Sequence, residues 1–214
     1  KTENVQDAKT EVSNETLRIE KTVERIAKII RGLKAFSRNA GHDPKISCEI
    51  HQVINESLDL CRQKLKQDNI QLRLNLPLKP LFFLGRPSQI SQVLLNLINN
   101  SIDAIKSTDS PWIELQLSHD QEMISLKLID SGPGITNDVA EKMMEPFFTT
   151  KEIGKGTGLG LSIAKGLMED HNGQISLDRM NPNTCFVINL PIEINPGLEP
   201  QIANLDFSGE NHNL

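Results

Sequence analysis

The sequence predicts an α/β (α+β) two-layer sandwich, in which helices cover one face of a mixed, mostly antiparallel sheet, preceded by one long bundle-forming helix. Two observations support this fold class. Between residues 45 and 194, segments with a helical apolar period follow segments whose apolar residues recur at every second position. Residues 2–40 instead contain no Pro and a single Gly, and they carry a seven-residue apolar repeat. The chain therefore divides into a helix at 1–41, a domain at 45–194 and a polar tail at 195–214 that we expect to be disordered.

Composition limits the classes of protein to which the chain can belong. Its 214 residues are 37% hydrophobic, enough for one core, and the net charge of −5 without a long basic block argues against nucleic acid as a partner. Cys48, Cys61 and Cys185 lie far apart without a CxxC pair, which argues against a zinc site and favours a reducing compartment. There is no signal peptide and no run of 18 apolar residues, and the start at Lys1 rather than Met indicates a piece of a longer protein.

The repeat in the first segment predicts a helix that needs a partner. One position of the repeat carries five apolar residues: Val5, Val12, Ile19, Ile26 and Leu33. The stripe is strong between residues 19 and 36, where it is as wide as a helix of a four-helix bundle requires. One helix cannot bury such a stripe alone, so we expect a second copy of the chain to cover it. The alternative is a helix that folds back on its own domain.

The helices of the domain follow from apolar residues at helical spacing. They are expected at residues 49–67, 87–106, 136–144 and 157–171. Pro87 stands at the start of the second of these, where its fixed backbone angle suits the first turn of a helix. Asn39-Ala40-Gly41 ends the long first helix, and residues 42–44 form the linker to the domain.

The strands of the domain follow from alternating or short continuous apolar runs. They are expected at residues 70–76, 81–84, 112–117, 123–129, 174–177 and 185–190. The third and fourth form an antiparallel pair around His119-Asp120. Between the helices, residues 145–158 are rich in Gly, Lys and Thr and predict a mobile loop.

Two asparagines interrupt the apolar helix at 87–106. Asn96 and Asn100 are four residues apart, so their amides lie on one face of the helix. Asparagine is a poor helix former, and two stacked amides in an apolar helix need a reason. An amide oxygen can bind Mg²⁺ without adding negative charge beside phosphates. The alternative is a pair of solvent-facing amides.

Glycine-rich turns follow one strand and precede one helix. Asp130-Ser131-Gly132-Pro133-Gly134 can place a carboxylate and bare backbone beside a small planar ligand, although an ordinary turn has the same composition. In residues 154–161, four glycines at alternate positions run into a helix, where free backbone N–H groups and the helix dipole favour phosphate. The Walker order is absent, and a hinge without a ligand is the alternative. In the stretch 145–151, Phe147 and Phe148 precede Lys151 and predict an anchor for the loop.

Together these stretches resemble the ATP-binding domain of sensor histidine kinases, in the superfamily shared with gyrase B, Hsp90 and MutL. In the family's order, residues 96–104 look like the asparagine box, 130–134 the first glycine box, 146–151 the phenylalanine box and 154–161 the second glycine box. The resemblance covers about residues 48–192. The family's closing strand resembles the segment after Thr184, except that Asn183 stands where the family has glycine. The helix at 12–40 resembles the second helix of the dimerisation hairpin.

The resemblance implies roles for individual residues. Asp130, helped by Thr184, would bind the adenine amino group; Asn100 would bind Mg²⁺, with Asn96 near the ion; and Lys151 and Lys155 would neutralise phosphate. Asn96, Asn100, Lys151 and Lys155 would thus be the catalytic set. The expected ATP-binding residues are Asn96, Asn100, Asp103, Asp130, Gly132, Gly134, Ile135, Phe148, Thr149, Lys151, Lys155, Gly156, Thr157, Gly158, Leu159, Gly160, Leu161 and Thr184. ATP and Mg²⁺ are the expected cofactors, with residues 147–157 as the ATP lid.

The family's phosphoacceptor has no counterpart in this sequence. None of the five histidines stands on an amphipathic helix before an acidic residue, and His42, which precedes Asp43-Pro44, lies in the linker. We therefore expect the chain to bind ATP and to phosphorylate a histidine on a helix that precedes Lys1 in the parent protein. The resemblance implies a cytoplasmic domain, a homodimer through the first helix, and a response regulator receiver domain as the partner. Membrane attachment could come only from segments outside the chain.

Two other functions stay open at this point. One is a gyrase-like ATPase, since residues 100–104 look like those of that class; those enzymes, however, have a glutamate as general base where this chain has Asn96, which cannot take a proton. The other is an ATP-binding dimerisation module without kinase activity. The signal, the response regulator and the choice between phosphorylation within and between subunits are not readable from the sequence.

Overall fold

A computed structural model describes residues 15–16, 19, 22–23, 44–152 and 156–193 of the chain. Most of the segment predicted as the long first helix, the tail 195–214 and Lys155 lie outside the described residues. Residues 15, 16, 19, 22 and 23 are helical, as the repeat predicts. The side chains of Ile19 and Val23, which both fall within the strong part of the predicted stripe at residues 19–36, are 62% and 59% exposed in the single chain.

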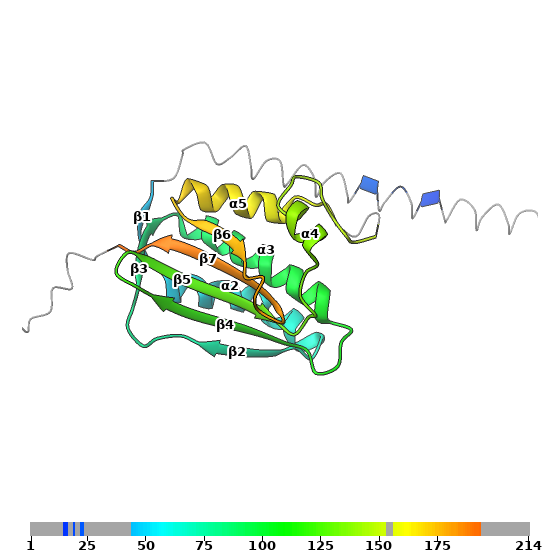
Figure 1. Ribbon diagram of the computed structural model, residues 1–214, viewed down its shortest axis with the longest axis horizontal. Coiled ribbons are helices and arrows are strands. Elements are labelled where there is room, and N and C mark those ends of the chain that lie inside the picture. The colour runs from blue at the N-terminus through cyan, green and yellow to red at the C-terminus, as the bar shows by residue number, and fades with distance from the viewer. Residues whose placement is uncertain (1–14, 17–18, 20–21, 24–43, 153–155, 194–214) are drawn as a thin grey trace, which may run out of the picture.

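The domain contains a five-stranded sheet in the order β2-β4-β5-β7-β6 and a small two-stranded sheet of β1 and β3. The strands are β1 (Ile46–Glu49), β2 (Gln71–Asn75), β3 (Phe82–Gly85), β4 (Trp112–His119), β5 (Met123–Asp130), β6 (Gln174–Leu177) and β7 (Thr184–Pro191). Only β2 and β4 are paired in parallel, and the other neighbours are antiparallel. The predicted mixed, mostly antiparallel sheet is confirmed (Figure 1).

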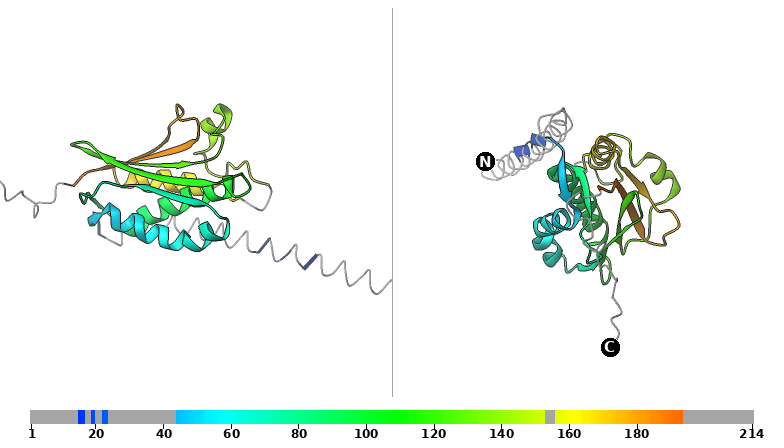
Figure 2. Two further views of the ribbon diagram at one scale, coloured as in Figure 1. Left: turned by 90° about the horizontal axis from the view of Figure 1, so that it is seen from below. Right: turned by 90° about the vertical axis from the view of Figure 1, so that its left-hand side faces the viewer.

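Three of the four helices that the structure describes in the domain form the second layer of the sandwich. The helices are α2 (Ile50–Gln67), α3 (Pro87–Ile105), α4 (Asn137–Lys142) and α5 (Gly160–Asp170). α3 lies between α2 and α5, and α2, α3 and α5 cover the same face of the sheet (Figure 2). The apolar positions of α3 that predict the helix, such as Leu94, Ile98 and Ile102, are all at most 1% exposed. α3 is therefore the central element of the core, which restricts its few polar side chains to specific partners.

The structure contains one strand that the sequence analysis does not predict, and one helix begins later than expected. The sequence at 46–49 has no clear strand signal, yet it forms β1, because β3 supplies a partner and the Cys48 side chain is buried there. α5 begins at Gly160 rather than at residue 157, so three more residues remain in the loop. This shift leaves Thr157 and Gly158 free to take the loop conformations described below.

Candidate functional site

Asp130 ends β5 as a buried carboxylate with donors from three elements. Asp130 is only 1% exposed. Ser101 of α3 donates to Oδ2 at 2.6 Å, and the Gly132 N–H donates to Oδ1 at 2.9 Å. Thr184, which pairs with Asp130 in the β5–β7 register, also bonds the carboxylate. Burial raises the pKa of Asp130, and the three hydrogen bonds oppose that rise.

The glycine turn after Asp130 is tightly packed. A Cβ at Gly132 would lie 2.7 Å from Asp130 Oδ1, and Gly134 has a φ of +85°, which favours glycine. The Asn183 Nδ2 group donates to the Gly132 carbonyl at 3.0 Å, across from β7. Asn183, the departure from the family pattern, therefore fixes the turn with a bond that a glycine could not make.

The second group of polar side chains lies along α3, with Lys151 from the loop. Lys151 Nζ is 2.8 Å from Asp103 Oδ2 and 3.5 Å from Asn100 Oδ1. Lys64 of α2 and Lys106 approach Asp103 Oδ1 at 3.4 and 3.8 Å. Burial would raise the pKa of Asp103, but the hydrogen bond and the charge of Lys151, together with Lys64, lower it overall. Three ammonium groups around one carboxylate leave a net positive charge, which suits an anion.

Asn96 connects α3 to the start of α5. Its Nδ2 group donates to the Gly160 carbonyl at 3.0 Å. A Cβ at Gly160 would lie 3.8 Å from the Asn96 amide, which is an ordinary contact. Asn96 and Asn100 thus share a face of α3, as their spacing predicts. Asn96, however, reaches the helix that follows the glycine-rich loop, and Asn100 faces Lys151.

The base of the loop is closed by a strained backbone contact. The Phe147 N–H donates to the Gly158 carbonyl at 2.9 Å, and both residues have positive φ, +69° and +67°. A Cβ at Gly158 would collide with the Phe147 backbone. Gly156 is similarly close to Thr149 and Lys151. The two glycines therefore hold the two ends of the loop together, with the Lys151 side chain directed to α3.

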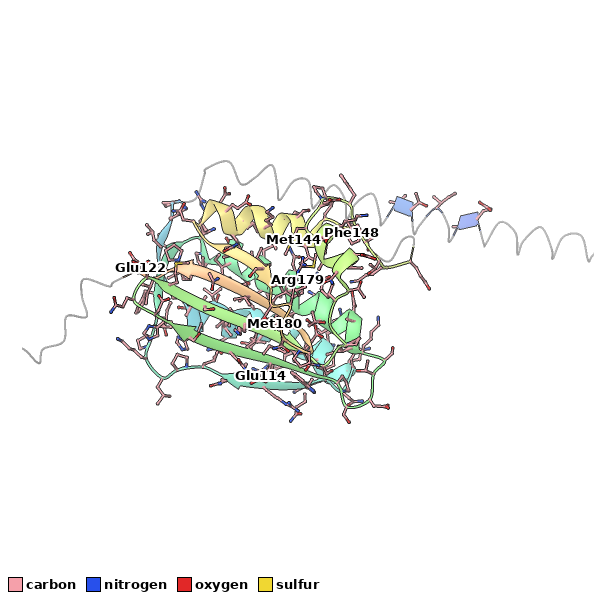
Figure 3. All side chains as sticks on the ribbon, viewed as in Figure 1. Glu114, Glu122, Met144, Phe148, Arg179 and Met180 are labelled. Carbon is pink, nitrogen blue, oxygen red and sulfur yellow. The ribbon has the colours of Figure 1, made fainter. Side chains whose placement is uncertain are left out.

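The remaining predicted residues lie around these two groups, mostly as packing elements. Leu159 is buried, and Ile135, Phe148 and Leu161 pack against the core, so they shape the site rather than offer polar groups. Phe148 follows α4, and its N–H donates to the Glu145 carbonyl at 3.3 Å; its side chain is labelled in Figure 3. The Thr157 hydroxyl accepts a bond from the Leu159 N–H at 3.4 Å, close to the start of α5.

Three residues of these groups were missed by sequence reasoning. Ser101 lies in the buried apolar stripe of α3, and a hydroxyl in such a stripe is itself a signal that a buried partner exists. Lys64 reaches Asn99 Oδ1 at 3.1 Å as well as Asp103, but nothing in its local sequence predicts that α2 lies against this part of α3. Asn183 was visible as a departure from the family, without an indication of its partner. In the part of the chain that the structure describes, no three His, Cys, Asp or Glu side chains form a metal cluster.

Comparisons with known proteins assign this arrangement to a family. Residues 85–194 match the family described as histidine kinase-, DNA gyrase B-, and HSP90-like ATPases. The chain belongs to this family. It is 34% identical over 172 residues to the C4-dicarboxylate transport sensor protein DctB of Rhizobium meliloti, which covers 80% of this chain and 27% of DctB. It is 33% identical over 175 residues to the sensor histidine kinase ZraS of Salmonella typhi, and this alignment covers 80% of this chain and 36% of ZraS.

Solved structures agree with this family assignment. The catalytic domain of the histidine kinase ThkA matches with a TM-score of 0.63 and 29% identity, over 70% of this chain and 96% of that domain. A structure of ThkA in complex with the response regulator TrrA shares the fold, with a TM-score of 0.65 and 23% identity. The match covers 79% of this chain and 48% of that chain. The chain thus contains an ATP-binding domain of the sensor histidine kinase type.

The chain is shorter than its relatives, since it spans 27% of DctB and 36% of ZraS. Among the helices that the structure describes, none has the length and apolar character needed to cross a bilayer.

Proposed function

We propose that the domain binds Mg²⁺-ATP and that the whole protein transfers the γ-phosphate to a histidine on a helix outside this chain. The observation that carries the proposal is the buried, triply bonded carboxylate of Asp130 beside a glycine turn. Burying a carboxylate costs free energy unless the carboxylate is hydrogen-bonded, and such groups are frequent at functional sites. A ligand amino group can donate one of these hydrogen bonds. The positive group around Lys151 would take the phosphates at the other end of the ligand.

The oxygen atoms around Lys151 fit a magnesium ion. The Asn100 amide oxygen and an Asp103 carboxylate oxygen both face the same ammonium group, so the protein already places oxygen ligands around one positive charge. Mg²⁺ prefers oxygen ligands and usually combines one or two protein oxygens with phosphates and water. Asn100 would hold the ion, with Asp103 close by. Bound Mg²⁺ would neutralise charge on the transferred phosphate.

The proposed transfer needs positioning rather than an acid or base from this domain. A histidine nitrogen attacks the γ-phosphorus, the bond from that phosphorus to the bridging oxygen of ADP breaks, and the histidine proton leaves to solvent. Lys151 and Lys155 would stabilise the phosphate oxygens, and the N–H groups around Gly156, Gly158 and Gly160 would orient them. Histidine supplies the nucleophile, so a general base for water is not required.

A gyrase-like ATPase is less consistent with the role of Asn96. An amide cannot accept the proton of an attacking water at neutral pH, and the Asn96 Nδ2 group is engaged with the Gly160 carbonyl. We therefore expect hydrolysis of ATP by the chain alone to be slow. Turnover at the rate of a true ATPase would contradict this assignment.

The partners proposed for the whole protein are a second copy and a response regulator receiver domain. The exposed Ile19 and Val23 support a homodimer through the first helix, because apolar side chains on a helix favour a covering partner. The complex of ThkA with its response regulator supports the second partner. We propose a cytoplasmic domain, which is where a response regulator would meet it.

The kinase proposal can be tested by supplying the missing helix. The chain is mixed with a separate His-bearing hairpin from a DctB-like relative and with γ-labelled ATP and Mg²⁺. Label on the hairpin histidine, lost when that histidine is replaced, supports the kinase. Tight ATP binding without label would instead support a nucleotide-binding module. A monomeric mass in light scattering at high concentration would contradict the homodimer.

A further inference from the structure

We propose that Ser101 is a positioning residue for nucleobase recognition, holding the Asp130 carboxylate so that it selects a ligand with an amino donor. This inference rests on the proposed nucleotide binding and goes beyond it, because it assigns the choice of base to a side chain on α3. The proposal depends on the geometry around one buried carboxylate.

The hydrogen-bonding capacity of Asp130 is nearly used up inside the protein. An ionised carboxylate offers about four acceptor sites. Ser101, the Gly132 N–H and Thr184 each donate to it, so three sites are taken and one remains for an external donor. An exocyclic amino group can fill that remaining site. A carbonyl oxygen at the same place on a base would face the carboxylate without a proton between them and would be repelled.

Ser101 and Gly132 donate to different oxygens of the carboxylate. The Gly132 N–H bonds Oδ1, whereas the Ser101 hydroxyl bonds Oδ2 at 2.6 Å, a short distance typical of a hydroxyl donating to a charged oxygen. Two elements far apart in sequence therefore hold the two oxygens, which prevents the carboxylate from rotating about its χ2 angle. Without the Ser101 hydroxyl, Asp130 Oδ2 would lose this donor. The carboxylate could then rotate, and Oδ2 would move into the position that the ligand amino group should occupy.

A second buried serine shows that the bond of Ser101 is not simply what a helical serine does. Ser57 of α2 is also buried, and its hydroxyl donates back to the Val53 carbonyl of its own helix at 2.7 Å and lies 2.9 Å from the Ser91 hydroxyl of α3. This is the usual way for a buried serine on a helix to satisfy its hydroxyl. Ser101 instead donates to a buried carboxylate, that of Asp130 at the end of β5. Ser57 is therefore a matched control in the same protein.

The experiment compares ATP with ITP, in which the 6-amino group is replaced by a carbonyl oxygen. We expect the wild-type chain to prefer ATP, and Ser101→Ala to lower the ratio of ATP to ITP affinity about tenfold, the effect of losing one hydrogen bond to a charged group. Because a ratio does not depend on the folded fraction, partial unfolding of the variant cannot produce this result. Ser57→Ala should leave the ratio unchanged even where it lowers the melting temperature.

Two further measurements separate positioning from packing. Loss of the Ser101 bond removes a contact that opposes the raised pKa of Asp130, so ATP affinity in Ser101→Ala should begin to fall at a higher pH than in the wild type. Ser101→Thr, which keeps the hydroxyl, should restore much of the ATP preference.

The outcomes distinguish this inference from the function on which it rests. If the wild-type chain binds neither ATP nor ITP, the proposed nucleotide binding itself fails. If it binds ATP selectively, and Asp130→Asn abolishes that selectivity while Ser101→Ala keeps it, only the role of Ser101 is overturned. A lower ratio in both serine variants would also overturn it, because a general loss of packing would then be the cause.

Discussion

The two ends of the site are built in different ways. At the Asp130 end, the polar groups are buried and lie on regular elements, with Ser101 on α3 and Thr184 on β7. At the Lys151 end, the polar side chains are about a third to a half exposed, and Lys151 itself comes from the loop. One end is fixed before a ligand arrives, whereas the other carries charges that water screens and that can change partners.

This difference indicates how the work is divided between the two ends. A buried carboxylate with one free acceptor site discriminates strongly between ligands, because a mismatched partner leaves a buried polar group unpaired. Half-exposed ammonium groups attract any phosphate chain, and salt weakens this attraction. The Asp130 end should therefore decide which nucleotide binds, and the Lys151 end should decide how its phosphates are placed.

The largest effect is expected from Asp130→Asn. The amide retains the shape of the side chain but presents an N–H₂ group toward one of its present donors or toward the ligand, which leaves a buried group unsatisfied. We expect ATP affinity to fall about 100-fold, or about 3 kcal/mol, in titration calorimetry. Unchanged affinity would show that the base is read elsewhere.

The same variant tests the protonation of Asp130. Burial raises its pKa, so in the wild type the carboxyl takes up a proton, and loses its ability to accept from the ligand, at a pH above the ordinary aspartate value of about 3.9. ATP affinity should fall as the pH is lowered through that range. The already weak affinity of Asp130→Asn should show no such fall.

The sequence was sufficient for the elements and motifs but not for the contacts between them. The apolar period of α3 and the alternation of β5 are local signals, and both elements were predicted within two residues. β1 was missed because a four-residue strand with one buried side chain depends on β3, about 35 residues away. Ser101 was missed as a partner of Asp130 for a related reason, since only the packing of α3 against β5 brings them together.

The effect of Gly158→Ala should be the next in size and should act on the phosphate end alone. Any side chain at Gly158 must adopt a positive φ and collides with the Phe147 backbone, so the two ends of the loop would separate. We expect ATP affinity to fall at least about tenfold, which corresponds to a loss of about 1.4 kcal/mol of binding free energy. Adenosine affinity should stay close to wild type.

Gly160→Ala is the matched control for this change. It lies in the same glycine-rich stretch, without a positive φ and with only an ordinary contact to Asn96. It should bind ATP nearly as well as the wild type. Equal losses in both variants would indicate that glycine is needed along the whole stretch, and not that the Phe147 contact sets the loop.

A smaller effect is expected from Asn100→Ala, which should remove most of the Mg²⁺ dependence of ATP binding. Without the amide oxygen, the ion would keep only its phosphate and water ligands. The measurement is a titration of ATP with and without Mg²⁺. Asn99→Ala is the control, because Asn99 lies next in sequence but bonds the Leu95 carbonyl and Lys64. An unaltered Mg²⁺ response in Asn100→Ala would place the ligand elsewhere.

The smallest effect should come from Asn183→Gly, which restores the residue usual for the family. The variant loses the bond from Nδ2 to the Gly132 carbonyl but leaves Asp130 and its three donors in place. A single neutral hydrogen bond at a half-buried turn contributes about 1 kcal/mol, so ATP affinity should fall about fivefold or less. Because only the turn is loosened, the loss should appear mainly as faster dissociation in stopped-flow measurements, and the ratio of ATP to ITP affinity should stay the same. A change in that ratio would mean that the turn, and not the carboxylate alone, reads the base.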